Sequence, residues 1–313
     1  MTPAPFHRLP GDPPARARAF WLRAEDGVRL RAAHWPAEAA QGTVLLFPGR
    51  TEYVEKYDEL AGQLASAGYH VLAIDWRGQG LSDRLQTNVR PGHVGAFSHY
   101  QRDVVELVIA AQELGLPEPW HLFAHSMGGA LGLAALDAGL PVRSVVFSAP
   151  MWGINLGRVP EWLVLTMTRA AARLGWGGRA APGSGGEESF VLMDPFLGNL
   201  LTGDGRRWGR LVAEAATWPD VSIGGASHDW LREALLECRR LATLASPDLP
   251  ALIALGLAEG VVSPAAIRDR ARRWPTAQLL ELPDCRHEPA MERDEIREVF
   301  VKATIAHFNA SAG

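Results

Sequence analysis

The chain has 313 residues, 47% of them hydrophobic, which is enough to bury a large core. Its formal net charge of -4, from 31 basic and 35 acidic residues, lacks the basic excess of nucleic-acid-binding proteins, so we exclude a nucleic-acid partner. Two cysteines, Cys238 and Cys285, are too few for a disulfide framework and favour a reducing compartment.

The N-terminus contains arginines but no apolar run of signal-peptide length, and no later segment approaches the roughly 18 apolar residues of a membrane span. We therefore expect a cytoplasmic protein. Peripheral attachment to the inner face of a membrane stays open, because it needs neither a signal peptide nor a span.

The first elements are predicted from their hydrophobic patterns. Residues 20–35 alternate between apolar and polar side chains around an Asp-Gly turn, which is a hairpin signal. TVLLFPG, residues 43–49, is a continuous apolar run that suits a strand buried on both faces of a parallel sheet. A helix is expected over 53–68, followed by a second buried strand and a glycine-rich turn over 70–80.

Strands and helices continue to alternate along the chain, which predicts an α/β fold with a doubly wound, mostly parallel sheet and helices on both faces. The expected elements are a helix over 100–115, a strand over 120–125, a helix over 127–139, a strand over 144–150 and, after an interruption, a helix over 228–244, a strand and turn over 250–260, a helix over 265–274, a strand and loop over 277–288 and a helix over 294–308.

The interruption begins after Pro150. It contains tryptophan-rich helical pieces, a glycine-rich spacer near 177–186 that we expect to be a mobile loop, and the loop-rich stretch GNLLTGDGRRW. We interpret residues 151–225 as an inserted helical cap, and residues 1–150 and 226–313 as the core.

A serine stands at the corner between the strand over 120–125 and the helix that follows. Ligands of parallel α/β sheets bind at the carboxyl ends of the strands, so Ser126 lies at the working edge of the sheet. The stretch AHSMG resembles a nucleophile elbow in which Ala124 replaces the usual first glycine, and small neighbours let the strand and the helix pass closely. The alternative is that Ser126 only caps the helix.

A serine hydroxyl is a weak nucleophile that needs a histidine base, itself oriented by a carboxylate. In this type of sheet the chain order is serine, acid, histidine. Glu259 follows a buried strand and His287 lies in the loop after the next strand, so we predict that they act with Ser126. Asp284 and Asp248 are alternative acids that do not follow a strand, and a solvated loop residue is the alternative for the histidine.

The negative charge that forms on an attacked carbonyl oxygen needs hydrogen-bond donors. We expect the main-chain N–H groups of Met127, after the nucleophile, and of Arg50, in the loop FPGRTEY, to supply them. An ordinary strand-to-helix turn is the alternative for that loop. Cys285 lacks an elbow, so we assign it no chemistry, and no metal or cofactor is implied.

With these residues in place, the chain resembles the α/β-hydrolase superfamily and, within it, the bacterial lysophospholipase and monoacylglycerol lipase branch. The resemblance implies that Ser126 is the nucleophile, Glu259 the acid and His287 the base. It covers nearly the whole chain after the N-terminal 20 residues and is carried by FPGRTEYVEKYDELAGQLASAGYHVLAIDWRGQGLSDR, HLFAHSMGGALG, NLLTGDGRRW, GLAEGVVSP and the closing RHE.

The chain departs from the family pattern at several positions. Pro48 stands where the family commonly has histidine, a glutamate replaces the more frequent aspartate, and Ser263 stands where a further acid often follows. Asp75 and Ser82 are similar to family residues that shape a turn by hydrogen bonds, and we assign them no chemistry.

In the family, the cap covers the active site and forms an acyl-chain tunnel. Six of the 11 tryptophans lie between residues 152 and 230, where they either bind acyl chains or form the core of the cap. The resemblance implies a serine hydrolase that releases fatty acid from single-acyl lipids, a lysophospholipid or a monoacylglycerol, through an acyl-enzyme. Its partner is then a small acyl ester or lipid, and contact between the cap and a membrane stays open.

Two kinds of alternative remain. One is another hydrolase with the same triad: a small-ester esterase, a peptidase or a perhydrolase. The other is a non-catalytic binding protein on a hydrolase scaffold, motivated by Pro48 and Ala124. The sequence does not indicate the head group, the acyl-chain length or the oligomeric state.

Overall fold

The computed structural model describes residues 1–186 and 188–311. Its strands are β1 (Thr2–Pro3), β2 (Arg18–Arg23), β3 (Arg29–Trp35), β4 (Gly42–Phe47), β5 (Tyr69–Asp75), β6 (Trp120–His125), β7 (Ser144–Ser148), β8 (Ala251–Gly256) and β9 (Ala277–Leu282). Its helices are α1 (Asp58–Ser66), α2 (His99–Glu113), α3 (Met127–Asp137), α4 (Glu161–Arg173), α5 (Phe190–Met193), α6 (Gly205–Thr217), α7 (His228–Thr243), α8 (Pro264–Arg272) and α9 (Asp294–Ala310), with 3-10 turns η1 (Val54–Tyr57) and η2 (Pro289–Met291).

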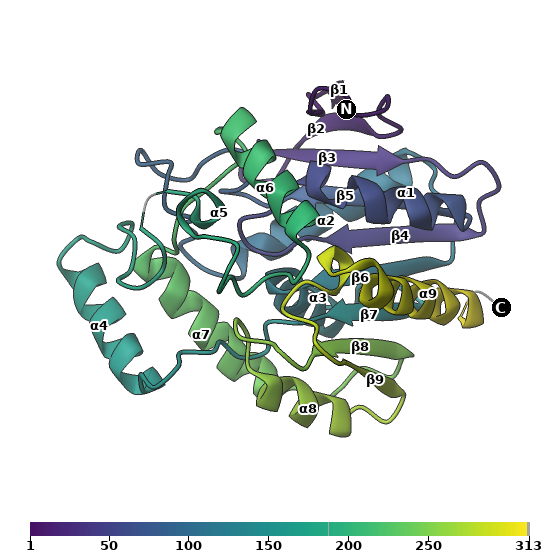
Figure 1. Ribbon diagram of the computed structural model, residues 1–313. Coiled ribbons are helices and arrows are strands. Elements are labelled where there is room, and N and C mark those ends of the chain that lie inside the picture. Colours follow the sequence, from purple (N-terminus) through teal and green to yellow (C-terminus); the bar gives the residue numbers. More distant parts are fainter. Residues whose placement is uncertain (187, 312–313) are drawn as a thin grey trace.

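The nine strands of the described residues join one sheet in the order β1-β2-β3-β5-β4-β6-β7-β8-β9. The pairs from β5 to β9 are parallel, whereas β1, β2 and β3 pair antiparallel at one edge. Helices lie on both faces of the sheet (Figure 1). The predicted mostly parallel, doubly wound α/β sheet is therefore confirmed.

The central strands explain the continuous apolar runs of the sequence. Every residue of β4, β6, β7 and β8 is buried, because helices cover both sides of these strands. The two faces carry separate apolar clusters, one around Trp76 and Trp274 and the other around Trp35 and Phe300. The core therefore sits in two layers, one on each side of the sheet.

The segment between β7 and α7 carries α4, α5 and α6. Helix α6 was not predicted from the sequence; its first turn lies in the stretch that we expected to be loop-rich. The carboxylate of Asp204 accepts hydrogen bonds from the main-chain N–H groups of Arg206 and Arg207, and this N-cap begins the helix. The spacer at 177–186 forms no helix, but Ala180 bridges to Ser227; Glu187 lies outside the described residues.

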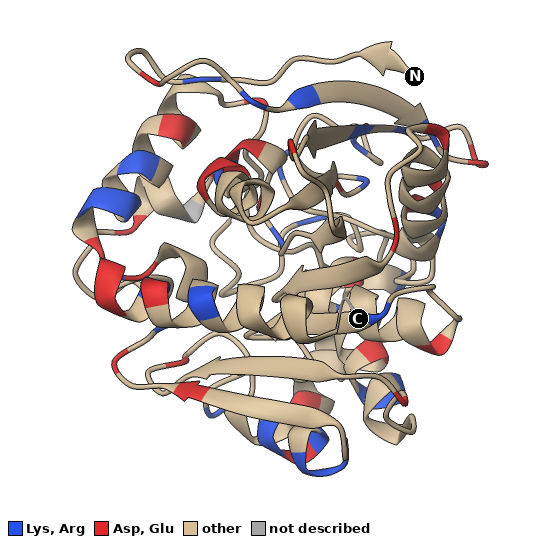
Figure 2. Ribbon diagram, turned by 90° about the vertical axis from the view of Figure 1, so that its right-hand side faces the viewer, with Lys and Arg blue, Asp and Glu red and all other residues tan. Residues whose placement is uncertain are grey.

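The parallel strands bring four predicted site loops to one edge of the sheet. The loops after β4, β6, β8 and β9 carry Arg50, Ser126, Glu259 and His287, and the carboxyl ends of parallel strands lie at the same edge. Basic and acidic positions are interspersed over the face shown in Figure 2. None of the helices in the described part of the chain has the length and apolarity needed to cross a bilayer.

Candidate active site

The backbone at Ser126 is strained, with φ of 51° and ψ of -117°. The side chain makes no capping hydrogen bond to α3; its Oγ lies 2.9 Å from Nε2 of His287. The alternative role as a helix cap is therefore wrong. Gly128 is required by contact, because a Cβ there would lie 2.1 Å from the carbonyl oxygen of Phe47. Met127 is the first residue of α3, so its N–H has no partner within the helix.

Glu259 and His287 meet as the sequence order predicted. Nδ1 of His287 lies 2.8 Å from Oε2 of Glu259, whose side chain is fully buried. The other oxygen, Oε1, accepts the main-chain N–H groups of Val261 and Val262 at 2.6 and 3.1 Å. Burial alone would raise the pKa of Glu259, but the hydrogen bond from His287 and the two main-chain N–H donors hold it below its usual value. The carboxylate is therefore held ionised against the imidazole.

The alternatives to the predicted acid, base and nucleophile do not fit these roles. Asp248 and Asp284 are exposed to solvent. His287 is only 3% exposed, so it is not a solvated loop histidine. Cys285 is buried and its pKa is raised by that burial, which makes the thiol a poor nucleophile.

The loop after β4 is held by hydrogen bonds on both sides of Arg50. The N–H of Gly49 donates to Oε2 of Glu52, and the N–H of Thr51 donates to Oε1 of Gln79 at 3.0 Å. The amide of Gln79 returns a hydrogen bond to the carbonyl of Gly49 at 3.2 Å. Both flanking N–H groups are thus used inside the protein, and the N–H of Arg50 stays the predicted oxyanion donor from this loop.

The side chain of Arg50 reaches toward the segment that leads into α7. Its guanidinium lies 4.9 Å from the ring centroid of Trp230 and donates to the carbonyl of Gly224 at 2.9 Å. Burial lowers the pKa of Arg50 to about 10. The predicted oxyanion loop is therefore tied to the end of the segment that we interpret as a cap.

A buried group of ionisable side chains lies beside the predicted triad and was not predicted from the sequence. Nζ of Lys56 lies 2.5 Å from Oε1 of Glu52 and 2.5 Å from Oε2 of Glu288; we call these three residues the Lys56 cluster. The ring of His125 lies 5.0 Å from that of His287, and burial lowers the pKa of His125 to about 3, so it is neutral. Two signals were available: Glu52 and Lys56 have (i, i+4) spacing, and Glu288 follows the predicted base.

The loop between α5 and α6 lies on the loop that carries His287. The main-chain N–H of His287 donates to the carbonyl of Leu200 at 3.2 Å, and that of Glu288 to Leu201 at 3.0 Å. The guanidinium of Arg286 donates to the carbonyl of Asn199 at 3.0 Å. The stretch NLLT, residues 199–202, thus packs against the loop that carries His287.

Six tryptophans lie between residues 152 and 230. Four of them are buried, so these four belong to the packing of the protein. Trp162 and Trp176 are 66% and 46% exposed. The buried residues are Trp152, Trp208, Trp218 and Trp230.

Asp75 and Ser82 have the expected structural role. Asp75 accepts from the guanidinium of Arg31 at 2.6 Å and from the N–H of Leu81 at 2.8 Å. The hydroxyl of Ser82 donates to the carbonyl of Asp75 at 2.6 Å. These bonds hold the turn after β5.

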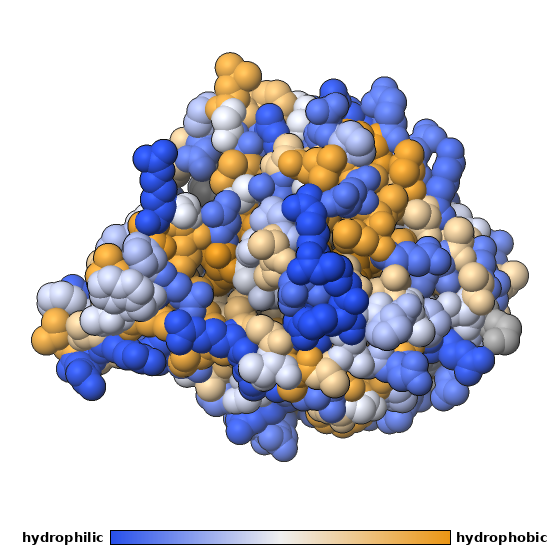
Figure 3. Space-filling view, turned by 90° about the horizontal axis from the view of Figure 1, so that it is seen from below, coloured by the Kyte–Doolittle hydropathy of each residue, from blue (hydrophilic) through white to orange (hydrophobic). Residues whose placement is uncertain are grey.

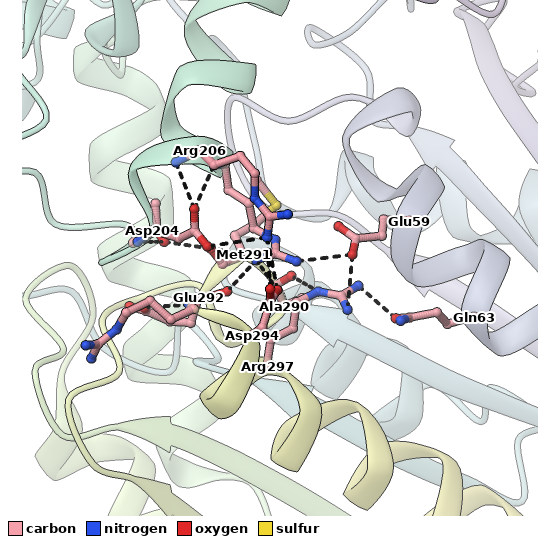
Figure 4. Close-up of polar contacts among 12 residues, drawn as sticks. Glu59, Gln63, Asp204, Arg206, Ala290, Met291, Glu292, Asp294 and Arg297 are labelled. Atoms are coloured by element: carbon pink, nitrogen blue, oxygen red, sulfur yellow. Dashed lines mark hydrogen bonds and ion pairs between the residues drawn. The ribbon is translucent and has the colours of Figure 1, made fainter. Parts of the chain in front are cut away.

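The start of α6 is joined to α1 and α9 by ion pairs. Figure 4 shows Arg206 beside Asp204 and Asp294, and Arg297 between Glu59 and Gln63. The distances are 3.1 Å from Arg206 to Asp294, 3.3 Å from Arg297 to Glu59 and 2.8 Å from Arg297 to Gln63. The start of α6 is therefore anchored on the core.

Comparisons with known proteins agree with this architecture. A family model described as "Serine aminopeptidase, S33" matches residues 38–294. Lysophospholipase L2 of Escherichia coli (strain K12) is 31% identical over 299 residues, covering 91% of this chain and 85% of that protein. Monoglyceride lipase of Rattus norvegicus is 29% identical over 128 residues, covering 40% of this chain and 41% of that protein.

Solved structures share the fold. A soluble variant of monoglyceride lipase from Saccharomyces cerevisiae, in complex with a substrate analog, has a TM-score of 0.73 and 18% identity, covering 93% of this chain and 96% of its own. The monoacylglycerol lipase of Paleococcus ferrophilus has a TM-score of 0.67 and 21% identity, covering 89% of this chain and 99% of its own. The resemblance to this branch of α/β hydrolases is confirmed, and the chain belongs to the serine aminopeptidase S33 family of hydrolytic enzymes.

Proposed function

We propose that the protein hydrolyses carboxylic esters of single-acyl lipids, lysophospholipids or monoacylglycerols, through an acyl-enzyme. Ser126 Oγ attacks the acyl carbonyl while Nε2 of His287 takes its proton, and Glu259 stabilises the imidazolium. The N–H groups of Arg50 and Met127 receive the negative charge on the carbonyl oxygen. His287 then returns the proton to the leaving alcohol, and water activated by the same ring releases the fatty acid.

The observation that carries this proposal is the pair of contacts along the triad. Ser126 Oγ lies 2.9 Å from His287 Nε2, and His287 Nδ1 lies 2.8 Å from Glu259 Oε2. These contacts give the serine a base, and the base an ionised carboxylate, within hydrogen-bond reach. The names of the relatives, lysophospholipase L2 and monoglyceride lipase, favour single-acyl lipids among esters.

We also propose that the segment around α4 and α5 contacts the lipid surface. Apolar side chains are exposed there, and Figure 3 shows orange apolar patches among hydrophilic side chains on the lower face. Exposed apolar patches with a polar rim are typical of interaction surfaces. The most exposed of these side chains are Trp162, Leu174, Met193 and Leu197, at 66%, 62%, 66% and 83%.

The family description also names an aminopeptidase, so peptide hydrolysis is the second candidate function. The same triad attacks amides and esters, and the contacts at Ser126 do not discriminate between them. An aminopeptidase would cleave an aminoacyl 4-nitroanilide and would lose this activity when the amino group of the substrate is blocked. A binding protein on this scaffold would cleave neither.

The test begins with a fluorophosphonate probe and intact mass on the wild type and on Ser126→Ala. We expect one adduct on the wild type and none on the variant. Initial rates are then compared for lysophospholipids, monoacylglycerols, short soluble esters and aminoacyl anilides, the lipids being offered both as monomers and in vesicles. Turnover of short esters alone contradicts the lipid proposal, and equal rates on monomers and vesicles contradict the surface contact.

A further inference from the structure

The Lys56 cluster is a buried arrangement of three ionisable side chains with short contacts. The side chains of Lys56, Glu52 and Glu288 are 7%, 5% and 5% exposed. Burial alone would raise the pKa of Glu52, but Lys56 and its other donors lower it to about 2, and the two carboxylates raise the pKa of Lys56 despite its burial. The attraction between an ammonium and two carboxylates is strong in such surroundings, because solvent does not screen the charges.

The cluster connects two loops that are far apart in the sequence. Glu52 ends the loop of Arg50, and its Oε2 accepts the N–H of Gly49 and, at 2.5 Å, the hydroxyl of Tyr57. Glu288 directly follows His287 in the loop after β9. Lys56 is therefore the bridge between the loop of the predicted oxyanion donor and the loop of the predicted base.

The same geometry speaks against a metal ion at this place. The ligand atoms of Glu52, His125 and Glu288 lie within 4.8 Å of one another, a spacing that suits a metal centre. However, Nζ of Lys56 lies 2.5 Å from one oxygen of each carboxylate. The ammonium thus takes the position that a divalent cation would need, and it supplies the positive charge itself.

We propose that Lys56 is a positioning residue for catalysis: its ammonium, shared by Glu52 and Glu288, holds the N–H of Arg50 in register with the ring of His287. The proposal rests on the proposed hydrolase function, because it assigns these two groups to the reaction. A carbonyl oxygen must reach the N–H of Arg50 while its carbon reaches Ser126, so a shift of one loop against the other misaligns the attack. Such a shift affects the transition state more than substrate binding.

The chain offers a matched control, because Lys56 and Lys302 are its only two lysines. Lys302 is 76% exposed and pairs with Glu298 on the surface of α9. We expect Lys56→Met to lower kcat on a soluble ester by a factor of about 10–100, with KM changed less than about twofold. Lys302→Met should leave both constants unchanged. A kcat for Lys56→Met within about twofold of that of Lys302→Met overturns the proposal, as does a loss confined to KM.

Glu288 provides the rescue by a conservative replacement. Glu288→Gln keeps an oxygen that accepts from the ammonium, whereas Glu288→Leu removes it, so the glutamine variant should lose clearly less kcat. Equal losses contradict the bridge. If Lys56→Met does not fold, the double variant Lys56→Met/Glu288→Leu breaks the bridge with one unpaired carboxylate fewer and is judged by the same criterion.

A second measurement separates failure of the bridge from failure of the proposed function. Protein labelled with [ε-13C]lysine gives two Cε signals in an NMR spectrum, and Lys302→Met assigns them. The signal of Lys56 should still be that of the ammonium at about pH 10.4, the ordinary lysine pKa. Deprotonation below that pH overturns the bridge even in an active enzyme. A wild type that hydrolyses no ester but keeps this signal refutes the hydrolase function and the catalytic role, and leaves only the buried bridge.

Discussion

Glu259 uses its two carboxylate oxygens for different partners. Oε2 faces Nδ1 of His287 at 2.8 Å, and Oε1 faces the N–H groups of Val261 and Val262. Because the N–H groups can only donate, they determine which end of an amide would face them. The pattern of donors therefore makes a glutamine at this position informative.

Glu259→Gln should place its amide oxygen toward Val261 and Val262, and its NH2 group toward His287. The ring then has to accept at Nδ1 and carry its proton on Nε2, the tautomer that is unable to accept the proton of Ser126. We expect kcat to fall by a factor of about 10³–10⁴ with little change in thermal stability. The measurement is kcat for a soluble ester together with a melting curve.

Glu259→Asp is the control that keeps the negative charge but shortens the side chain. Its side chain is one methylene shorter, so it keeps the negative charge but does not span both the N–H donors and the ring. We expect an intermediate loss, smaller than that of the glutamine variant. A glutamine variant with more than about a tenth of the wild-type kcat would remove Glu259 from the proposed mechanism.

At the residue scale, the sequence predicted the positions that follow strands. Ser126, Glu259 and His287 each come after an apolar run, and parallel strands bring such positions together. The Lys56 cluster was not predictable in this way. Lysine and glutamate near the start of a helix are usually solvated, and their burial here requires the loops after β4 and β9 to meet, which no local pattern encodes.

At the element scale, α6 is the part of the segment between β7 and α7 that is fixed to the core. Arg207 is the centre of its anchorage: its side chain is 8% exposed and lies 3.0 Å from Asp204, 2.8 Å from Asp294 and 3.1 Å from Glu59. It also donates to the carbonyl of Glu292 at 3.0 Å. Its neighbour Arg206 is 69% exposed and pairs with the same Asp294 at 3.1 Å.

The adjacent arginines provide a matched pair of variants. Arg207→Met removes a largely buried donor and leaves Asp204 with only the longer ion pair to Arg206, at 3.8 Å, so we expect the free energy of unfolding to fall by about 1–3 kcal/mol. Arg206→Met should change it by less than about 0.5 kcal/mol, because surface ion pairs are screened by solvent. Urea denaturation measures both. Equal effects of the two substitutions would show that α6 is not anchored through Arg207.

Helices and strands with a clear hydrophobic pattern were predicted more accurately than those without one. Strands such as β4 and β6 are mostly apolar and were placed to within two residues. The start of α6 was missed because Gly203, Gly205 and Gly209 lower helix propensity around it, so it read as a loop. Its stability comes from the Asp204 cap and from contacts with α1 and α9, which are distant in sequence.

At the scale of the whole molecule, several histidines are buried away from solvent and kept neutral. Burial lowers the pKa of His125 to about 3 and, together with the nearby charge of Arg143, that of His121 to about 4. The ordinary histidine pKa is about 6.5, so below that pH the unfolded chain binds protons that the folded chain does not. Folding stability is therefore complete above about pH 6.5 and decreases as the pH falls toward these folded pKa values.

We expect this effect to appear as an acid shift of the melting temperature. At about pH 5, a fully buried histidine of this kind costs on the order of 2 kcal/mol of folding free energy, so the melting temperature should fall clearly between about pH 7 and pH 5. His121→Asn removes one such group and keeps a polar partner for the hydroxyl of Ser144, which lies 2.8 Å from Nδ1. Its melting temperature should depend less steeply on pH below about 6.5, while above about pH 7 the two proteins differ by a constant offset. Parallel curves throughout would mean that His121 is protonated in the folded protein as readily as in the unfolded chain.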